Sequence, residues 1–360
     1  MAGSPLFIMS GKKYFYWLFL FLSSGIFKIP EIKAGKRLLL ILLLFISVNS
    51  PVAFSQIKRI VAIGSSTTVG VGATSPDSGW ISLLNQYYKC RLGVIDSAYN
   101  LGVVGTDNYY AMPTGYVSPP ARPSPDTAHN VSKACFILSD LSSAAHGVVI
   151  VNFPTNDYNI YSIAEIMSSL QTIYNYATTV GHSCFISTTQ PRGDDNFNNP
   201  AAKRKLADIK DSIISRFGTA HTLNFWDGMF NPADSTILDT YSSGDLVHFN
   251  NAGYRVLFER VIAKNIFGLP VWYSKPSGNL NELSTWGSNT DGSGSSPESF
   301  ATDNQVFNVV NNTQPTIGAN WILSGKNIQL IIGDGILPIN FIVPPGLTVS
   351  ITGPVINNCY

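Results

Sequence analysis

Charged residues are scarce in this chain of 360 residues, and no extended basic run is present. Only 12% of the residues are Asp, Glu, Lys or Arg, and the formal net charge is +1. The first 55 residues hold six of the 23 basic and one of the 22 acidic residues, which leaves 17 basic and 21 acidic residues and a net charge of −4 elsewhere. Such a body lacks the Lys and Arg that displace counterions from phosphates. We therefore exclude nucleic acid as a partner.

Cysteine is also rare, and its spacing carries no metal or redox signature. The chain has four cysteines, none in a CxxC or Cys/His ligand pattern: Cys90, Cys135, Cys184 and Cys359. A zinc site and a redox dithiol are therefore not indicated. If the chain is exported, four cysteines permit three disulfide pairings, and the sequence does not choose among them. Buried free thiols are the equal alternative.

The N-terminus holds two apolar stretches, residues 14–27 and 38–48, and the second follows a short basic segment. This layout is typical of a secretory signal peptide, because residues 38–48 are too few to span a bilayer as a helix. The small residues Ala53 and Ser55 predict cleavage before Gln56. We expect a secreted or cell-surface protein. A membrane anchor, or a start codon assigned too far upstream, is the alternative reading of residues 14–27.

From residue 57 onward, short apolar runs alternate with amphipathic stretches, which is typical of βα units around a parallel sheet. The predicted strands at 58–64 and 147–153 have cores of consecutive apolar residues, at 60–63 and 148–151, as expected for strands that helices cover on both faces. Further strands are predicted at 93–99, 185–188 and 222–225, and helices at 163–177, 206–217 and from 251 to a boundary near Pro270. The predicted division is a leader at 1–55, an α/β domain at 56–269 and a third region at 270–360.

The third region is rich in Trp, Asn, Ser, Gly and Thr. Its β-like runs lie at 305–310, 321–323, 328–332, 339–343 and 347–351. This spacing of about ten residues predicts a β-rich module, either a small sandwich or the first coils of a β-solenoid. The Asp-Gly-Ser segment at 291–296 lacks the ligand spacing of a calcium loop, so we expect a solvated turn there.

Two segments carry residues that suit acyl-transfer chemistry. Ser66 lies in the segment Gly-Ser-Ser-Thr-Thr, where the first strand should lead into a helix at the ligand-binding edge of the sheet. Asp245 lies three residues before His248 in a late loop, so its carboxylate can approach Nδ1 and fix the imidazole tautomer. Each motif alone is common, since a serine after a strand is often only a helix cap.

With two further blocks, the chain resembles the SGNH or GDSL family of serine hydrolases. Ser66 occupies the place of the family's nucleophile, Gly102 that of its glycine, Asn156 that of its asparagine, and Asp245 with His248 that of its Asp-x-x-His pair. The four blocks occur in the family's order and together are far more specific than any one of them. They cover nearly all of the predicted α/β domain and say nothing of the β-rich module.

The resemblance implies a three-layer α/β/α sandwich with a parallel, flavodoxin-like sheet. Ser66 would attack an ester carbonyl, with His248 as base and then acid and Asp245 orienting that histidine. The backbone amides of Ser66 and Gly102 and the side-chain amide of Asn156 would hold the oxyanion, and such donors contribute roughly 3–4 kcal/mol each when judged by removal. No metal or other cofactor is implied.

The sequence departs from the family's pattern at two blocks. Ser65 stands where the family usually has Asp before the nucleophile, and Ser65 is the rival nucleophile. The third block reads Phe-Pro-Thr-Asn-Asp at 153–157 rather than Gly-x-Asn-Asp, but it keeps the Asn-Asp pair. We expect Asp157 to support the loop that carries Asn156.

Other polar residues are open to two interpretations. Arg192 either borders the pocket and meets an anionic or sugar substrate, or forms a surface salt bridge. Tyr109 and Tyr110 either line the cleft or pack as aromatic core. The remaining four histidines are interpreted as structural, because we expect none to have a matching carboxylate in a small-residue context: His129, His146, His182 and His221.

We therefore predict an exported carboxylic-ester hydrolase that removes short acyl groups, such as acetyl, from carbohydrate. A lipase or lysophospholipase of the same family is the nearest alternative. A surface protein that binds glycans without catalysis is the alternative from another class, with the β-rich module as its working part or only as a stalk. Exposure of Trp286 and Trp321 in a groove would favour glycan contact over a stalk.

Overall fold

The computed structural model describes residues 58–91, 94–139, 147–194, 197, 199–325, 328–333 and 339–351. The predicted leader and its cleavage site lie outside these residues. Residues 55–360 form one compact unit, and the predicted division of this unit at residue 270 stays a prediction. Within the described ranges, no helix has both the length and the apolar character that crossing a membrane would require.

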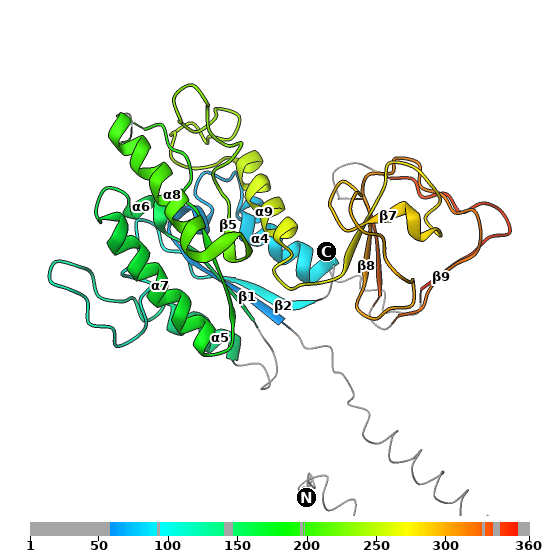
Figure 1. Ribbon diagram of the computed structural model, residues 1–360, viewed down its shortest axis with the longest axis horizontal. Helices are drawn as coiled ribbons and strands as arrows, with labels where there is room; N and C mark the ends of the chain where they lie inside the picture. The colour runs from blue at the N-terminus through cyan, green and yellow to red at the C-terminus, as the bar shows by residue number, and fades with distance from the viewer. Residues whose placement is uncertain are drawn as a thin grey trace, which may run out of the picture. The chain divides into compact units, whose positions relative to one another are not determined.

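A five-stranded parallel sheet organises the first part of the chain (Figure 1). Its strands are β1 (Lys58–Gly64), β2 (Ile95–Asn100), β3 (Val148–Asn152), β4 (Ser183–Ser187) and β5 (Thr222–Leu223). They lie in the order β2-β1-β3-β4-β5, and every neighbouring pair is parallel. This is the order of flavodoxin-like, doubly wound sheets, in which ligands bind beyond the carboxyl ends of the strands.

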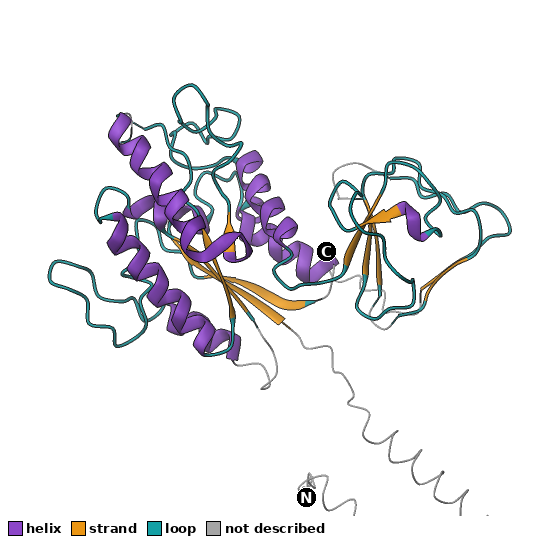
Figure 2. Cartoon of the chain, viewed as in Figure 1, coloured by secondary structure: helices purple, strands orange, loops and turns teal. Residues whose placement is uncertain are grey.

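Helices cover both faces of this sheet (Figure 2). They are α3 (Ser66–Val69), α4 (Trp80–Asn85), α5 (Val131–Ser139), α6 (Pro154–Asp157), α7 (Ile163–Thr179), α8 (Pro200–His221) and α9 (Asn251–Lys264), with short turns η1 (Pro76–Ser78) and η2 (Gln86–Arg91) beside α4. Alternate residues of β1 belong to opposite apolar clusters: Val61 and Ile63 pack with α5, α7 and α8, whereas Ile60 and Ala62 pack with α4 and α9. Burial on both faces explains the continuous apolar run of β1, and the predicted three-layer fold is confirmed.

Polar caps fix where the long helices begin. The side chains of Ser162, Asn199 and Asn250 accept hydrogen bonds from backbone amides in the first turns of α7, α8 and α9, respectively. Such caps satisfy amides that have no partner inside the helix. The cap at Asn250 matters most for the site, because it sets the start of α9 at Asn251, three residues after His248.

The β-rich region has its own strands: β6 (Val271–Ser274), β7 (Trp286–Gly287), β8 (Val306–Val309), β9 (Trp321–Leu323), β10 (Gln329–Ile332) and β11 (Val349–Ile351), with a short turn η3 (Leu283–Thr285) before β7. Strands β6, β8 and β10 pair in parallel, and so do β9 and β11. Thr316 forms parallel bridges with both Asn279 and Ile342. Three parallel ladders that repeat along the chain favour the β-solenoid over the sandwich. The predicted strand at 339–343 is reduced to the single bridge at Ile342.

The two tryptophans whose exposure would favour glycan contact over a stalk form the core of this region. Trp286 and Trp321 are 0% and 1% exposed, and their ring centroids lie 5.8 Å apart. The indole N–H of Trp286 donates to the carbonyl oxygen of Leu280. Neither ring offers a face to a glycan.

Candidate active site

Ser66 is held at a sharp turn between β1 and α3. It is the first residue of α3 and follows β1 after only Ser65. The turn depends on a glycine, because a Cβ at Gly64 would lie 2.6 Å from the carbonyl oxygen of Asn152. The serine therefore stands at the carboxyl edge of the sheet, beside the point where the strand order reverses.

The structure brings Ser66, His248 and Asp245 into one hydrogen-bonded chain. Ser66 Oγ lies 2.9 Å from His248 Nε2, although the two residues are 182 positions apart. His248 Nδ1 lies 2.6 Å from Asp245 Oδ2. The hydroxyl of Ser65 makes no such contact in the described part of the chain, which favours Ser66 over its rival. A hydroxyl, an imidazole and a carboxylate in this order are the parts of a base-activated nucleophile.

The turn that carries the histidine also holds the carboxylate in its charged form. Asp245 Oδ1 accepts hydrogen bonds from the amides of Val247 and His248 at 2.9 and 2.8 Å. Burial alone would raise the pKa of Asp245, but the hydrogen bonds from His248 and Val247 outweigh it and lower that pKa. Between them, Leu246 adopts the left-handed conformation with φ of 57°, which L residues rarely do. An ionised Asp245 keeps a proton on Nδ1 and leaves Nε2 to accept one from Ser66.

The three predicted oxyanion donors differ in whether their N–H groups already donate a hydrogen bond within the protein. The Ser66 amide, at the start of α3, has no acceptor among the described residues. The Asn156 side-chain nitrogen donates one hydrogen to the carbonyl oxygen of Thr106 at 2.9 Å, which leaves its second hydrogen available. The Gly102 amide donates its only hydrogen to Asn100 Oδ1 at 2.9 Å. An oxyanion would therefore have to share the Gly102 amide with Asn100.

Asn100 is a residue that the sequence reasoning missed as part of the site. Its side chain accepts from Gly102 and donates to the carbonyl oxygen of Thr68 at 2.7 Å, so it ties the end of β2 to α3. A Cβ at Gly102 would lie 2.8 Å from the Val69 nitrogen, so only glycine fits there. An Asn two residues before a glycine is a recognisable side-chain turn, and that was the available signal.

Gln190 links a second strand end to the same turn. Its side-chain nitrogen donates to the hydroxyl of Thr67, and its backbone amide donates to the Thr155 hydroxyl at 2.9 Å. Gln190 is buried, follows β4 and therefore joins β4, α3 and α6 at the carboxyl edge. Arg192, two residues on, forms a paired hydrogen bond with Asp194 at 2.8 and 3.0 Å, which is the salt-bridge interpretation of that residue.

Tyr109 belongs to the core rather than to the cleft. It is buried, its hydroxyl donates to Glu165 Oε1 at 2.8 Å, and its ring packs edge-on against Tyr161. Tyr110 is half-buried. Of the two interpretations left open for Tyr109, aromatic packing in the core is therefore the one that holds.

The interpretation of His129 as a histidine without a carboxylate is wrong. His129 Nδ1 lies 2.8 Å from Asp126 Oδ2, three residues earlier. The signal was present in the sequence, because Asp126 and His129 form a second Asp-x-x-His. His182 contacts the Ser139 hydroxyl at 3.2 Å and His221 lies among aromatic rings, whereas His146 is outside the described residues.

The cysteines take no part in the candidate site. Cys135 and Cys184 are free and buried, and Cys90 is disulfide-bonded. Burial raises the pKa of the Cys135 thiol to about 12, so it is not a thiolate nucleophile at neutral pH. Among the residues that the structure describes, no group of three or more His, Cys, Asp or Glu side chains could hold a metal ion. Asp291 instead caps a local turn by accepting from the Ser293 amide at 2.9 Å.

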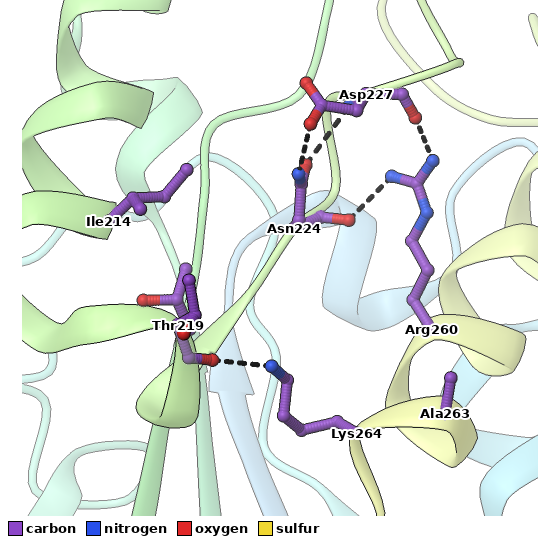
Figure 3. A pocket seen from close by; sticks show the side chains of 8 residues that line it. Ile214, Thr219, Asn224, Asp227, Arg260, Ala263 and Lys264 are labelled. Carbon is purple, nitrogen blue, oxygen red and sulfur yellow. Dashed lines mark hydrogen bonds between the residues drawn. The ribbon is translucent and has the colours of Figure 1, made fainter. Parts of the chain in front are cut away.

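A cavity of about 350 Å³ lies between α8, the end of β5 and α9 (Figure 3). In it, Arg260 donates to the carbonyl oxygens of Asn224 and Asp227, and Lys264 donates to that of Thr219. Both cations thus brace main chain on the flank of the sheet. No residue of the Ser66 chain or of the predicted oxyanion set lines this cavity, so it is separate from the candidate active site.

The comparisons with known proteins agree with this geometry. A model of the GDSL-like lipase/acylhydrolase family matches residues 62–256. The chain is similar in structure to a GDSL-like lipase from Bacteroides thetaiotaomicron, with 16% identity, a TM-score of 0.41 and coverage of 62% of this chain and 94% of that one. The psychrotrophic esterase EstA from Pseudoalteromonas sp. gives 13% identity, a TM-score of 0.40 and coverage of 58% and 96%. A lipolytic G-D-S-L family protein from Veillonella parvula has 15% identity, a TM-score of 0.39 and coverage of 57% of this chain and 96% of that one. A search of curated proteins found no match.

The assignment rests on the family match, which covers more than half of the chain and includes all four blocks, from Ser66 to His248. The neighbours' identities and TM-scores are too low to add to it. The chain belongs to the GDSL-like lipase/acylhydrolase family and is a carboxylic-ester hydrolase.

Proposed function

We propose that this protein hydrolyses its ester through a covalent acyl-enzyme on Ser66. The observation that carries the proposal is the unbroken chain from Ser66 Oγ through His248 to Asp245. His248 Nε2 takes the Ser66 proton as Oγ bonds to the ester carbonyl carbon, and the carbonyl oxygen becomes an oxyanion. The Ser66 amide and the free hydrogen of Asn156 Nδ2 are donors for that oxyanion.

The remaining steps return the enzyme to its starting state. Imidazolium His248 gives its proton to the alkoxide oxygen as the bond between that oxygen and the carbonyl carbon breaks, which releases the alcohol. A water molecule then attacks the acyl carbon while Nε2 takes its proton. The tetrahedral adduct collapses with the proton returning to Ser66 Oγ, and the acid leaves. Asp245 holds the imidazole in the required tautomer and stabilises its charged form.

For the substrate, we propose short acyl groups, such as acetyl, carried on carbohydrate. Support comes from the β-rich region that follows the hydrolase fold in the chain, since it adds polar surface to the protein. That region holds a polar cavity of about 420 Å³, which includes Asn279, Glu282, Asn312 and Gln314 among its lining residues. Amide and carboxyl groups of this kind hydrogen-bond sugar hydroxyls, so this cavity is the proposed glycan contact in place of the buried tryptophans.

One observation favours the second candidate, a lipase or lysophospholipase. Three aliphatic side chains are exposed shortly after the three predicted oxyanion residues: Val69 at 42%, Val104 at 61% and Ile160 at 52%. Apolar side chains beside a reaction centre would stabilise a longer acyl chain. Acetyl esters would gain little from them.

A panel of p-nitrophenyl esters from acetate to palmitate, with acetate release from an acetylated polysaccharide, separates these candidates. We expect kcat/KM to be highest for acetate and butyrate and to vanish in Ser66→Ala. A maximum at long chains, lowered by Val104→Ser, would establish the second candidate instead. Activity retained in Ser66→Ala would overturn the acyl-enzyme on this residue. The glycan contact is tested by binding of the inactive Ser66→Ala protein to the insoluble polysaccharide. We expect this protein to bind, and we expect binding to be lost when Gln314→Ala is added to it.

We also propose export, with the mature chain beginning at Gln56. The apolar N-terminal segments support it, and so does the disulfide at Cys90, because disulfides persist in oxidising compartments. N-terminal sequencing of the protein recovered outside the cytoplasm should read Gln56 first. A mature protein that keeps residues 38–48 would point to an anchor.

A further inference from the structure

We propose that Asp157 is a positioning residue that holds the side-chain amide of Asn156 ready for the oxyanion, acting through the loop at residues 106–108. The inference rests on the proposed acyl-enzyme mechanism. Asp157 does not touch the reacting atoms. It acts on the loop residue that fixes which way the Asn156 amide faces.

Three consecutive loop residues are each bonded by one side chain from the segment 156–161. The Thr106 carbonyl oxygen accepts from Asn156 Nδ2 at 2.9 Å, and Asp157 Oδ1 accepts from the Asn108 amide at 3.0 Å. Between them, Asp107 Oδ2 accepts from the Tyr161 hydroxyl at 2.8 Å. We call these three bonds the 106–108 clamp. Asn156 and Asp157 are adjacent in the chain, so their bonds to Thr106 and Asn108 form a closed loop of covalent and hydrogen bonds. A shift of the 106–108 segment therefore also shifts the Asn156 side-chain amide.

The clamp is anchored to the protein interior. Asp157 and Asn108 are both 0% exposed, and Asn108 Nδ2 donates to the hydroxyl of Ser169 in the middle of α7 at 3.1 Å. That hydroxyl in turn donates to the Ile166 carbonyl oxygen at 2.9 Å. A long helix packed on the sheet therefore sets the position of the loop, and through it that of Thr106.

The carboxyl group of Asp157 has no ion-pair function to explain its burial. Its Oδ2 is buried and has no hydrogen-bond partner among the described residues. Burial raises the pKa of Asp157 well above its usual range, and the nearby carboxyls of Asp107 and Glu165 raise it further. An unpartnered buried oxygen costs stability. The contribution of Asp157 lies in its single hydrogen bond to the loop.

That bond matters because an amide side chain has two distinguishable ends. A carbonyl oxygen accepts hydrogen bonds only, so the Thr106 carbonyl requires the nitrogen of Asn156, and not its oxygen, to face the loop. This fixes the plane of the amide and the direction of its second N–H. Donors aimed in advance at the developing charge lower the barrier, whereas a donor free to rotate must be ordered during the reaction. Loosening the clamp should therefore lower kcat and leave KM nearly unchanged.

The test compares Asp157→Ala with Asp157→Asn in the full chain, using p-nitrophenyl acetate. Asp157→Asn keeps an oxygen for the Asn108 amide, so we expect kcat close to that of the wild type. Asp157→Ala should lower kcat on the order of 10- to 100-fold with little change in KM, as small misplacements of catalytic groups do. Asp96→Ala is the matched control: Asp96 also has one bonded and one unpartnered buried oxygen, but it lies at the other end of β2. Its kcat should stay at the wild-type value.

A double-mutant cycle separates positioning from general loosening of the fold. In an Asn156→Ala background, Asp157→Ala should lower kcat no further, because the residue through which it acts is gone. An equal loss in both backgrounds, or an unchanged kcat in a folded Asp157→Ala, would overturn the inference. If Asp157→Ala does not fold, Tyr161→Phe is the alternative variant. It removes the hydrogen bond to Asp107, keeps the aromatic side chain and should still reduce kcat. Failure of Ser66→Ala to abolish activity would instead refute the underlying mechanism.

Discussion

Two Asp-x-x-His turns occur in this protein, at residues 245–248 and 126–129, and their local geometries are nearly the same. The likeness is in the carboxylate-imidazole contact and not in the backbone, since Leu246 is left-handed with φ of 57°. In both, the Asp Oδ2 lies close to the His Nδ1, at 2.6 and 2.8 Å. In both, the Asp Oδ1 accepts the amide two residues on at 2.9 Å. Only the first turn has a nucleophile: His248 Nε2 meets Ser66 Oγ, whereas no bond from the His129 Nε2 is found among the described residues.

The two turns differ in whether the fold brings a distant side chain to the Nε2 atom of the histidine. The 245–248 turn directly precedes α9 and faces the end of β1, so a serine 182 residues away reaches it. The 126–129 turn belongs to the long connection between β2 and α5. Its histidine side chain is 41% exposed, against 18% for His248. A carboxylate-imidazole pair thus forms within four consecutive residues. It becomes a catalytic base only where the sheet topology brings a serine to the other imidazole nitrogen.

The largest contrast should appear when the imidazoles are removed. We expect His248→Ala to lower kcat for p-nitrophenyl acetate on the order of 10⁴-fold or more, because the serine loses its base. His129→Ala should retain wild-type kcat, since among the described residues its ring hydrogen-bonds Asp126 alone. Initial rates of the two purified variants, with circular dichroism to verify folding, provide the measurement. A comparable loss in His129→Ala would mean that the second turn also serves the reaction.

Replacing the carboxylates should give a smaller contrast of the same sign. Asp245→Asn would favour the imidazole tautomer with its proton on Nε2, so we expect a loss of kcat on the order of 10²- to 10⁴-fold. Asp126→Asn is the matched control and should leave kcat unchanged. If Asp245→Asn keeps full activity, the hydrogen bonds of this turn orient His248 without the charge.

These turns also indicate which parts of the fold and of the site can be predicted from the sequence alone. The pattern of β1 and the stripes of α7 and α9 predicted their elements because burial on defined faces leaves a period in the sequence. The four family blocks predicted which residues would meet at the strand ends. By contrast, the pairing of His129 with Asp126 could be predicted from the three-residue spacing alone, because a carboxylate so placed reaches Nδ1 of the histidine.

The remaining misses depend on contacts between distant residues. The Asn-x-Gly spacing was a local signal for the bond from the Gly102 amide to Asn100, but the second bond of Asn100, to the Thr68 carbonyl oxygen, depends on how β2 ends against α3. Trp286 and Trp321 lie in a segment rich in polar residues, and their rings meet only because β7, antiparallel to β6, and β9, parallel to β11, contribute to one core. Residue spacing suggested both a sandwich and a solenoid. The choice between them was fixed by strand direction, which a single short run does not encode.

The smallest expected contrast is in the pH dependence of stability. In both turns burial raises the Asp pKa, yet the hydrogen bonds outweigh it and lower the pKa of Asp245 and of Asp126. A carboxyl whose pKa is lower in the folded state stabilises that state at any pH above its unfolded pKa of about 3.9. This contribution is lost as the pH falls below about 4 toward the folded-state pKa. Asp245→Asn and Asp126→Asn should therefore differ most from the wild type in Tm near neutral pH, and the differences should shrink below pH ~4.

Solvent limits the size of this effect and makes the comparison between the turns informative. The side chains of Asp245 and Asp126 are 48% and 31% exposed, so screening keeps each Tm difference to about 2–4 °C at most. The Asp245 carboxylate accepts from more amides and faces the less exposed histidine, so its variant should show the larger pH-dependent part. Calorimetry at pH 3 to 7 measures both. A Tm difference that grows on acidification would mean that the folded state raises these pKa values, and that the turns are held by the neutral acid instead of by the charge.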